Sequence, residues 1–176
     1  MSADDRTAFR VLHDGPAPLL LPNAWDVASA LALVADGHPA IGTTSLGVAA
    51  AAGIPDTFRA GLGATVALAR ALARLPVPVT VDLADGFADD PIAVAALVAD
   101  LPAAGVNLED STDGRLVDPG LHAAKVAAVA GSCPGSSSTP GWTRTGWGRT
   151  PISRPPSTGP GATWPPAPTA SSCPAG

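Results

Sequence analysis

Short apolar runs alternate with longer alanine-rich stretches along the first 130 residues of the chain. The short runs have the length and β-branched content of buried strands, and the longer stretches have the length of helices. Strands are predicted at residues 18–21, 39–42, 77–81 and 106–108, and helices at residues 25–35, 61–75, 90–104 and 118–130. Asn23 or Asp26 can cap the first helix, and Asp90 and Asp118, each followed by proline, open the last two. Residues 43–47 are predicted to form a loop.

Four strand–helix units in series imply a parallel sheet with right-handed crossovers. The predicted fold class is therefore α/β, a parallel (βα) barrel of TIM type. A complete eight-fold barrel needs roughly 250 residues, so we expect the 176 residues to hold only about four βα units. The predicted domains are a partial barrel over residues 1–130 and a tail over residues 131–176.

Charge and hydropathy exclude two kinds of partner. The formal net charge is −5, and Lys125 is the only lysine. A nucleic-acid surface needs clustered lysine and arginine, so no nucleic-acid partner is expected. No apolar run reaches the roughly 18 to 20 residues of a membrane span, and the N-terminus lacks the pattern of a targeting segment. We expect a soluble, cytoplasmic protein without membrane contact.

The sequence changes character after residue 130. Residues 131–176 consist mostly of Pro, Gly, Ser and Thr and contain no acidic residue. By composition this is an irregular or disordered tail, because it cannot bury enough apolar surface to offset its ordering entropy. However, it holds Trp142, Trp147 and Trp164, and disordered segments are usually poor in aromatic residues.

A shift of reading frame is the alternative explanation of the tail. Tryptophan has a single codon, so residues 141–143 are encoded GGN-TGG-ACN, and triplets that start on the third base include GAC, which specifies aspartate. In the same frame residues 137–143 can encode a strand that ends in charged residues, and residues 164–175 a glycine turn and an apolar strand. Our hypothesis is that the frame changes at about residues 129–131, through a genuine frameshift or a sequence error, which sequencing the encoding DNA would decide.

Two predicted strands are followed by carboxylates. Asp82 ends the third apolar run, and Glu109 and Asp110 follow the fourth. Since the carboxyl ends of neighbouring parallel strands meet at one edge of the sheet, these acids should lie close together, where a βα barrel keeps its chemistry. The alternative is that Asp82 and Glu109 cap helices or pair with arginines.

An ordered set of short motifs resembles a known family. The motifs are Leu-Pro-Asn-Ala-Trp-Asp at 21–26, Thr-Thr-Ser-Leu at 43–46, Gly-Ile-Pro-Asp at 53–56, Val-Pro-Val-Thr-Val-Asp at 77–82 and Val-Asn-Leu-Glu-Asp-Ser at 106–111. Over residues 10–130 the chain resembles the N-terminal half of the isocitrate lyase and phosphoenolpyruvate mutase family. The resemblance implies a modified βα barrel that binds Mg²⁺ and a small carboxylate or phosphonate substrate. Family members cleave or rearrange C–C or P–C bonds of 2-oxo or 2-hydroxy acids through an enolate-like intermediate.

The resemblance also assigns metal ligands. Asp82 would bind Mg²⁺ directly, and Asp56 and Glu109 would act through bound waters, which suits a hard cation that keeps several waters. For Asp56 an ordinary turn role is the alternative. Ala84 stands where the family often has a second acid, and Asp85, one residue later, replaces it only if the loop shifts.

The substrate side of the site is assigned in the same way. Thr44, Ser45 and Leu46 match the family loop whose backbone N–H groups and hydroxyl hold the substrate carboxylate. The alternative is a plain connection between a strand and a helix. Trp25 either forms a wall of the pocket or packs onto the end of the barrel. No catalytic residue is assigned, because the segment after Glu109 lacks the lysine- and cysteine-bearing gating loop of isocitrate lyases.

Two functions from different classes remain open. One is a Mg²⁺-dependent lyase or mutase, whose intact relatives are homo-oligomers. The other is an inactive half-barrel with an exposed sheet edge, because the arginine and aspartate expected after the fifth strand occur only in the shifted frame. A ligand-binding module without chemistry is a third alternative.

Overall fold

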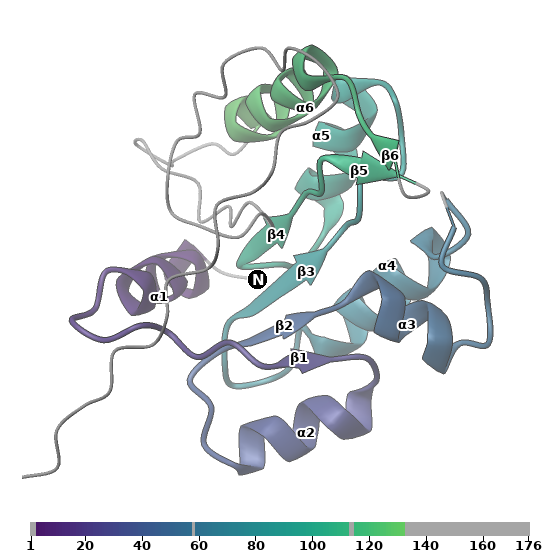
Figure 1. Cartoon of the computed structure of the whole chain (residues 1–176). Helices are drawn as coiled ribbons and strands as arrows, with labels where there is room; N and C mark the ends of the chain where they lie inside the picture. Colours follow the sequence, from purple (N-terminus) through teal and green to yellow (C-terminus); the bar gives the residue numbers. More distant parts are fainter. Residues whose placement is uncertain (1–2, 58, 113–114, 133–176) are drawn as a thin grey trace, which may run out of the picture. The chain divides into compact units, whose positions relative to one another are not determined.

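The computed structural model describes residues 3–57, 59–112 and 115–132, so almost all of the predicted tail lies outside the described residues. Four strands form one parallel sheet in chain order (Figure 1): β1 (Asn23–Ala24), β2 (Ile41–Thr43), β3 (Val79–Asp82) and β4 (Gly105–Asn107). The pairing β1-β2, β2-β3 and β3-β4 is parallel throughout. The prediction of an α/β fold built on a parallel sheet is confirmed.

Helices connect and flank the strands: α1 (Ala3–His13), α2 (Val27–Ala35), α3 (Ser45–Ala51), α4 (Leu62–Leu72), α5 (Pro91–Asp100) and α6 (Pro119–Ser132). A short antiparallel hairpin of β5 (Ser111–Thr112) and β6 (Arg115–Leu116) follows β4. Neither α1 nor the hairpin was predicted from the pattern of the sequence. No helix within the described ranges is long and apolar enough to cross a membrane.

Polar caps fix the helix starts that the sequence indicated. The Asp26 carboxylate accepts the Ser29 N–H at 2.6 Å, and the Ser29 hydroxyl accepts the Asp26 N–H, which completes a capping box at α2. Asp90 accepts the Ile92 N–H at 3.0 Å at the start of α5. Asp118 accepts the Leu121 N–H at 2.9 Å at the start of α6. These side chains satisfy N–H groups that have no partner within the first helical turn.

Three element predictions need correction. Residues 18–21 form no strand, because pairing with β2 begins at Asn23, and Leu20 is 72% exposed. Residues 43–47 are not a loop throughout, because α3 already begins at Ser45 and continues into alanines that favour a helix. The helix predicted to reach residue 104 ends at Asp100, since Leu101 precedes a proline and adopts an extended conformation.

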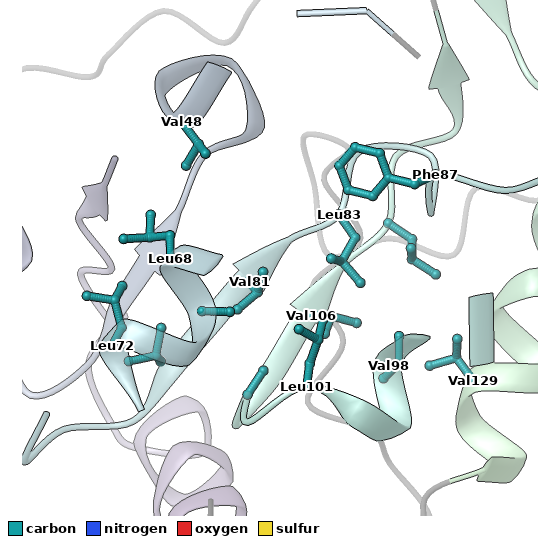
Figure 2. Packing of buried hydrophobic residues seen from close by; sticks show 14 of the residues in the cluster. Val48, Leu68, Leu72, Val81, Leu83, Phe87, Val98, Leu101, Val106 and Val129 are labelled. Atoms are coloured by element: carbon teal, nitrogen blue, oxygen red, sulfur yellow. The ribbon is translucent and has the colours of Figure 1, made fainter. Parts of the chain in front are cut away.

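The two faces of the sheet differ in chemistry. One face carries apolar side chains, which belong to the hydrophobic core shared with the helices: Ala24, Ile41, Val79, Val81 and Val106. Figure 2 shows Leu68 and Leu72 of α4 beside Val81, and Val98 of α5 beside Val106. The alternation of side chains along each strand puts small or polar residues on the opposite face: Asn23, Gly42, Thr80, Asp82, Gly105 and Asn107.

A second apolar cluster lies at the amino ends of the strands. Phe9 of α1 is fully buried and packs with Ala40 and Ala104, which precede β2 and β4. Leu19 and Leu21 pack against the same cluster. The apolar run that suggested a strand therefore closes this end of the sheet, and the carboxyl ends of the strands are left for the site.

Candidate functional site

A cavity of about 420 Å³ lies at the carboxyl ends of β2, β3 and β4. All predicted site residues except Trp25 line this cavity: Thr44, Ser45, Leu46, Asp56, Asp82, Asp85 and Glu109. Thr57, Arg59, Gly61, Ala84, Phe87, Ser111 and Thr112 complete the lining. The parallel sheet thus brings together acids that stand 26 to 27 positions apart in the sequence, from 56 to 82 to 109.

Asp82 is the last residue of β3 and is held by backbone N–H groups on both carboxylate oxygens. Oδ2 accepts the Ser45 N–H at 2.8 Å, and Oδ1 accepts the Ala84 N–H at 3.0 Å. Its own N–H donates to the Thr43 hydroxyl at 3.0 Å. The residue is only 7% exposed, so these bonds fix the carboxylate with little freedom. Each carboxylate oxygen can accept a second interaction from the cavity side.

The segment Thr44–Ser45–Leu46 joins β2 to α3. Thr44 is the N-cap residue, but its side chain makes no capping hydrogen bond. Ser45 and Leu46 begin the helix, where N–H groups have no acceptor within the helix, and the Ser45 N–H uses Asp82 as its acceptor. The segment predicted to hold a substrate carboxylate therefore also orients the strongest metal-ligand candidate.

Glu109 follows β4 and is half-buried beside the other acids. Burial raises the pKa of its carboxyl group, and the negative charges of Asp82, Asp56, Asp110 and Asp85 raise it further. Its N–H donates to the Ala84 carbonyl at 2.6 Å. Asp56, on the segment after α3, is exposed and faces the same cavity. The cavity concentrates negative charge, and the Arg59 guanidinium in its wall is bonded to Asp89 at 2.9 Å.

Asp85 lies in the cavity wall but already has a cationic neighbour that the sequence gave no reason to expect there. The Lys125 Nζ lies 3.6 Å from Asp85 Oδ2 and donates to the Asp85 carbonyl oxygen at 2.9 Å. Both side chains are nearly inaccessible to solvent, and they stand 40 positions apart. Sequence reasoning used Lys125 only as a count of positive charge. The sequence feature that could have indicated a special role for Lys125 is its place as the only lysine, among small residues of a predicted helix.

Trp25 lies outside the cavity lining. Its side chain is 49% exposed, and its Cβ would lie 3.1 Å from a Cβ added to Gly47 of α3. Trp25 thus lies beside the start of α3 and outside this cavity.

The sequence profile of the phosphoenolpyruvate phosphomutase family matches residues 9–137. The match covers every residue that lines the cavity. The chain belongs to the phosphoenolpyruvate mutase family. The uncharacterized protein Rv1998c of Mycobacterium tuberculosis strain H37Rv is 53% identical over 122 residues, which cover 69% of this chain and 47% of that protein. This chain therefore spans about half the length of the curated relatives that it matches.

Solved structures of this superfamily share the fold. A Burkholderia cenocepacia J2315 protein with a provisional phosphonomutase assignment is 36% identical, with a TM-score of 0.68 over 73% of this chain and 55% of its own. The structure of 2,3-dimethylmalate lyase, a PEP mutase/isocitrate lyase superfamily member, is 22% identical, with a TM-score of 0.65 over 75% of this chain and 48% of its own. Oxaloacetate acetylhydrolase is 24% identical, with a TM-score of 0.66 over 73% of this chain and 48% of its own.

The donor set in the cavity fits a hydrated Mg²⁺ ion. Within residues 3–57, 59–112 and 115–132, no three His, Cys, Asp or Glu side chains are grouped so that they could hold a metal ion together. Mg²⁺ does not need such a group, because it is commonly bound through one or two carboxylates and keeps several waters. Burial is the main cause of the raised pKa of Glu109, and the neighbouring carboxylates add to it; a cation in the cavity would offset their negative charge.

Proposed function

We propose that the site belongs to a Mg²⁺-dependent lyase or mutase that cleaves or rearranges C–C or P–C bonds of small 2-oxo or 2-hydroxy carboxylates through an enolate. One observation carries the proposal: Asp56, Asp82 and Glu109 face one cavity at the carboxyl ends of the strands. Membership of the phosphoenolpyruvate mutase family supports the same class of chemistry.

Each part of the cavity has a proposed task. Asp82 would bind Mg²⁺ directly, and Asp56 and Glu109 would hold waters bound to the ion. Bound Mg²⁺ stabilises negative charge that develops on a substrate oxygen. Thr44, Ser45 and Leu46 would hold the substrate carboxylate through a hydroxyl and through N–H groups other than that of Ser45, which already donates to Asp82. The solved relatives named for oxaloacetate and 2,3-dimethylmalate suggest small dicarboxylates as first substrates to test.

A specific observation favours a second candidate, an inactive half-barrel. The chain spans about half the length of its curated relatives, and parts of residues 131–176 can be read in a shifted frame as a strand that ends in charged residues and as a glycine turn before an apolar strand. Loops from the later βα units set the substrate in such barrels, and a shifted frame would replace the residues of those units.

Metal binding tests the site separately from turnover. Mn²⁺, a spectroscopic substitute for Mg²⁺, is titrated into the 176-residue protein and its Asp82→Asn variant. Asp100→Asn is the matched control, because Asp100 is exposed on α5 and pairs with Arg70 outside the cavity. We expect Asp82→Asn to weaken binding at least tenfold and Asp100→Asn to leave it unchanged. Equal affinity in all three proteins would contradict the proposed metal site.

Turnover then distinguishes the two candidates. The 176-residue protein and a version with the restored frame are assayed with Mg²⁺ and oxaloacetate or 2-methylisocitrate. We expect turnover in the restored protein alone, which would identify the present chain as an inactive fragment of an enzyme. Equal turnover in both would refute the frameshift interpretation of the tail.

A further inference from the structure

We propose that Lys125 and Asp85 are positioning residues, which hold the loop of residues 83–87 in the conformation that aims the Asp82 carboxylate into the cavity. The 83–87 loop connects β3 to the segment before α5. Lys125 lies on α6 and reaches this loop from 40 positions further along the chain. The pair therefore connects a helix that contributes nothing to the cavity lining with a loop that does.

The contacts of the pair are local and specific. The Lys125 Nζ donates to the Asp85 carbonyl oxygen at 2.9 Å and lies 3.6 Å from Asp85 Oδ2. Asp85 Oδ1 accepts the Phe87 N–H at 3.0 Å. Lys125 is 1% exposed and Asp85 3% exposed, so neither charge has water as an alternative partner. Asp85 thus has partners inside the protein on both carboxylate oxygens, and we assign its charge to the pair with Lys125.

The loop needs such a restraint because its backbone is strained. Ala84 has φ 47° and Phe87 has φ 57°, both in the left-handed region that non-glycine residues seldom occupy. The strained segment contacts both principal acids of the cavity. The Ala84 N–H donates to Asp82 Oδ1, and the Ala84 carbonyl accepts the Glu109 N–H. If the loop relaxed, Asp82 would lose one of the two hydrogen bonds that orient its carboxylate.

Hydrogen exchange without metal tests the restraint itself. Lys125→Met, Asp85→Asn and the double variant are compared with Val129→Ala, a core substitution on the same helix as Lys125. We expect each single variant to speed exchange at the amides of residues 84, 86 and 87 at least tenfold more than at the Val81 amide. Val129→Ala should speed loop and core exchange alike. Equal acceleration of loop and core in the Lys125 and Asp85 variants would overturn the proposal.

The double variant removes both buried charges and so guards against simple loss of folding. It should recover thermal stability relative to the single variants, because no unpaired charge stays buried. Its loop amides should nevertheless exchange as fast as those of the single variants, since the connection to α6 is gone. Recovery of slow loop exchange in the double variant would show that the pair has no positioning role.

The consequence for metal binding rests on the proposed function. We expect Lys125→Met to weaken Mn²⁺ binding about tenfold and Asp85→Asn to add little in the Lys125→Met background. If Asp85 were a direct ligand, Asp85→Asn would reduce affinity by the same factor in both backgrounds, which would overturn the assignment of Asp85. Failure of Asp82→Asn to affect Mn²⁺ would reject the metal site alone, because the exchange experiment uses no metal.

Discussion

Gly86 lies within the 83–87 loop, and replacing it by alanine tests how tightly this loop is packed. The residue has φ +99°, and a Cβ added there would lie 2.9 Å from both Val94 Cγ atoms and 3.5 Å from Leu108 Cδ2. Gly86→Ala should therefore lower the free energy of unfolding in two ways. The left-handed backbone costs roughly 1–2 kcal/mol for a residue with a Cβ, and overpacking against buried Val94 costs roughly 1–3 kcal/mol.

The two penalties can be separated within this chain. Gly37 has φ +89° with no atom within 4 Å of an added Cβ, so Gly37→Ala measures the backbone penalty alone. Val94→Ala removes both contacting methyl groups and itself costs roughly 2–3 kcal/mol through lost burial and a cavity. In the Val94→Ala background, Gly86→Ala should therefore cost only the roughly 1–2 kcal/mol of backbone strain.

Urea unfolding followed by far-ultraviolet circular dichroism measures all four proteins and the double variant. The expected total for Gly86→Ala is about 2–5 kcal/mol, a large part of the roughly 5–15 kcal/mol that stabilises a typical domain. The coupling between Gly86 and Val94 should be about 1–3 kcal/mol. An identical cost of Gly86→Ala with and without the Val94 methyl groups would refute the packing argument.

Two further substitutions test the charges. Glu109→Gln should stabilise the protein at neutral pH by on the order of 0.5 kcal/mol, since the side chain is half exposed. Because the pKa of Glu109 is raised in the folded state, the ionised carboxylate lowers the free energy of unfolding of the wild type at pH values above that pKa. The difference in free energy of unfolding between Glu109→Gln and the wild type should therefore shrink as the pH falls through that pKa. A difference that does not change with pH in urea melts would contradict this. Asp90→Ala should cost about 1 kcal/mol through loss of the cap on the Ile92 N–H. The matched control is Asp89→Ala, which removes an exposed ion pair with Arg59 and should lower the stability by less than about 0.5 kcal/mol. Equal losses of stability in Asp89→Ala and Asp90→Ala in thermal melts would reject the capping argument.

The sequence predicted those features that follow from local pattern and parallel topology. Asp82 and Glu109 were expected to meet because both follow buried strands, and the structure places both in one cavity. Asp90 was expected to open a helix because it precedes proline, and its side chain caps α5. Spacing alone therefore located the acids, since the carboxyl ends of parallel strands share one edge.

Features that depend on contacts distant in sequence were not predictable. The Lys125–Asp85 pair joins residues 40 positions apart, and neither residue lies in a periodic pattern that would indicate its partner. The prediction of a strand at residues 18–21 was wrong for the same reason, because the position of these residues depends on contacts distant in sequence. An apolar run fits a strand and an end cluster equally well, and only the packing of Leu19 and Leu21 with Phe9 distinguishes them.

The different chemistry of the two sheet faces separates folding from catalysis in this chain. Val79, Val81 and Val106 face the helices and belong to the hydrophobic core, which among the described residues extends to Val129 of α6. The opposite face, which points into the interior of a complete barrel, carries Thr80 and Asp82 along β3, so it offers little apolar surface for packing against further βα units. The apolar core of the described residues and the acid Asp82 therefore lie on opposite faces of the sheet. Cooperative unfolding of the 176-residue protein would thus be compatible with complete loss of activity, and a turnover assay is needed to distinguish an enzyme from a folded fragment.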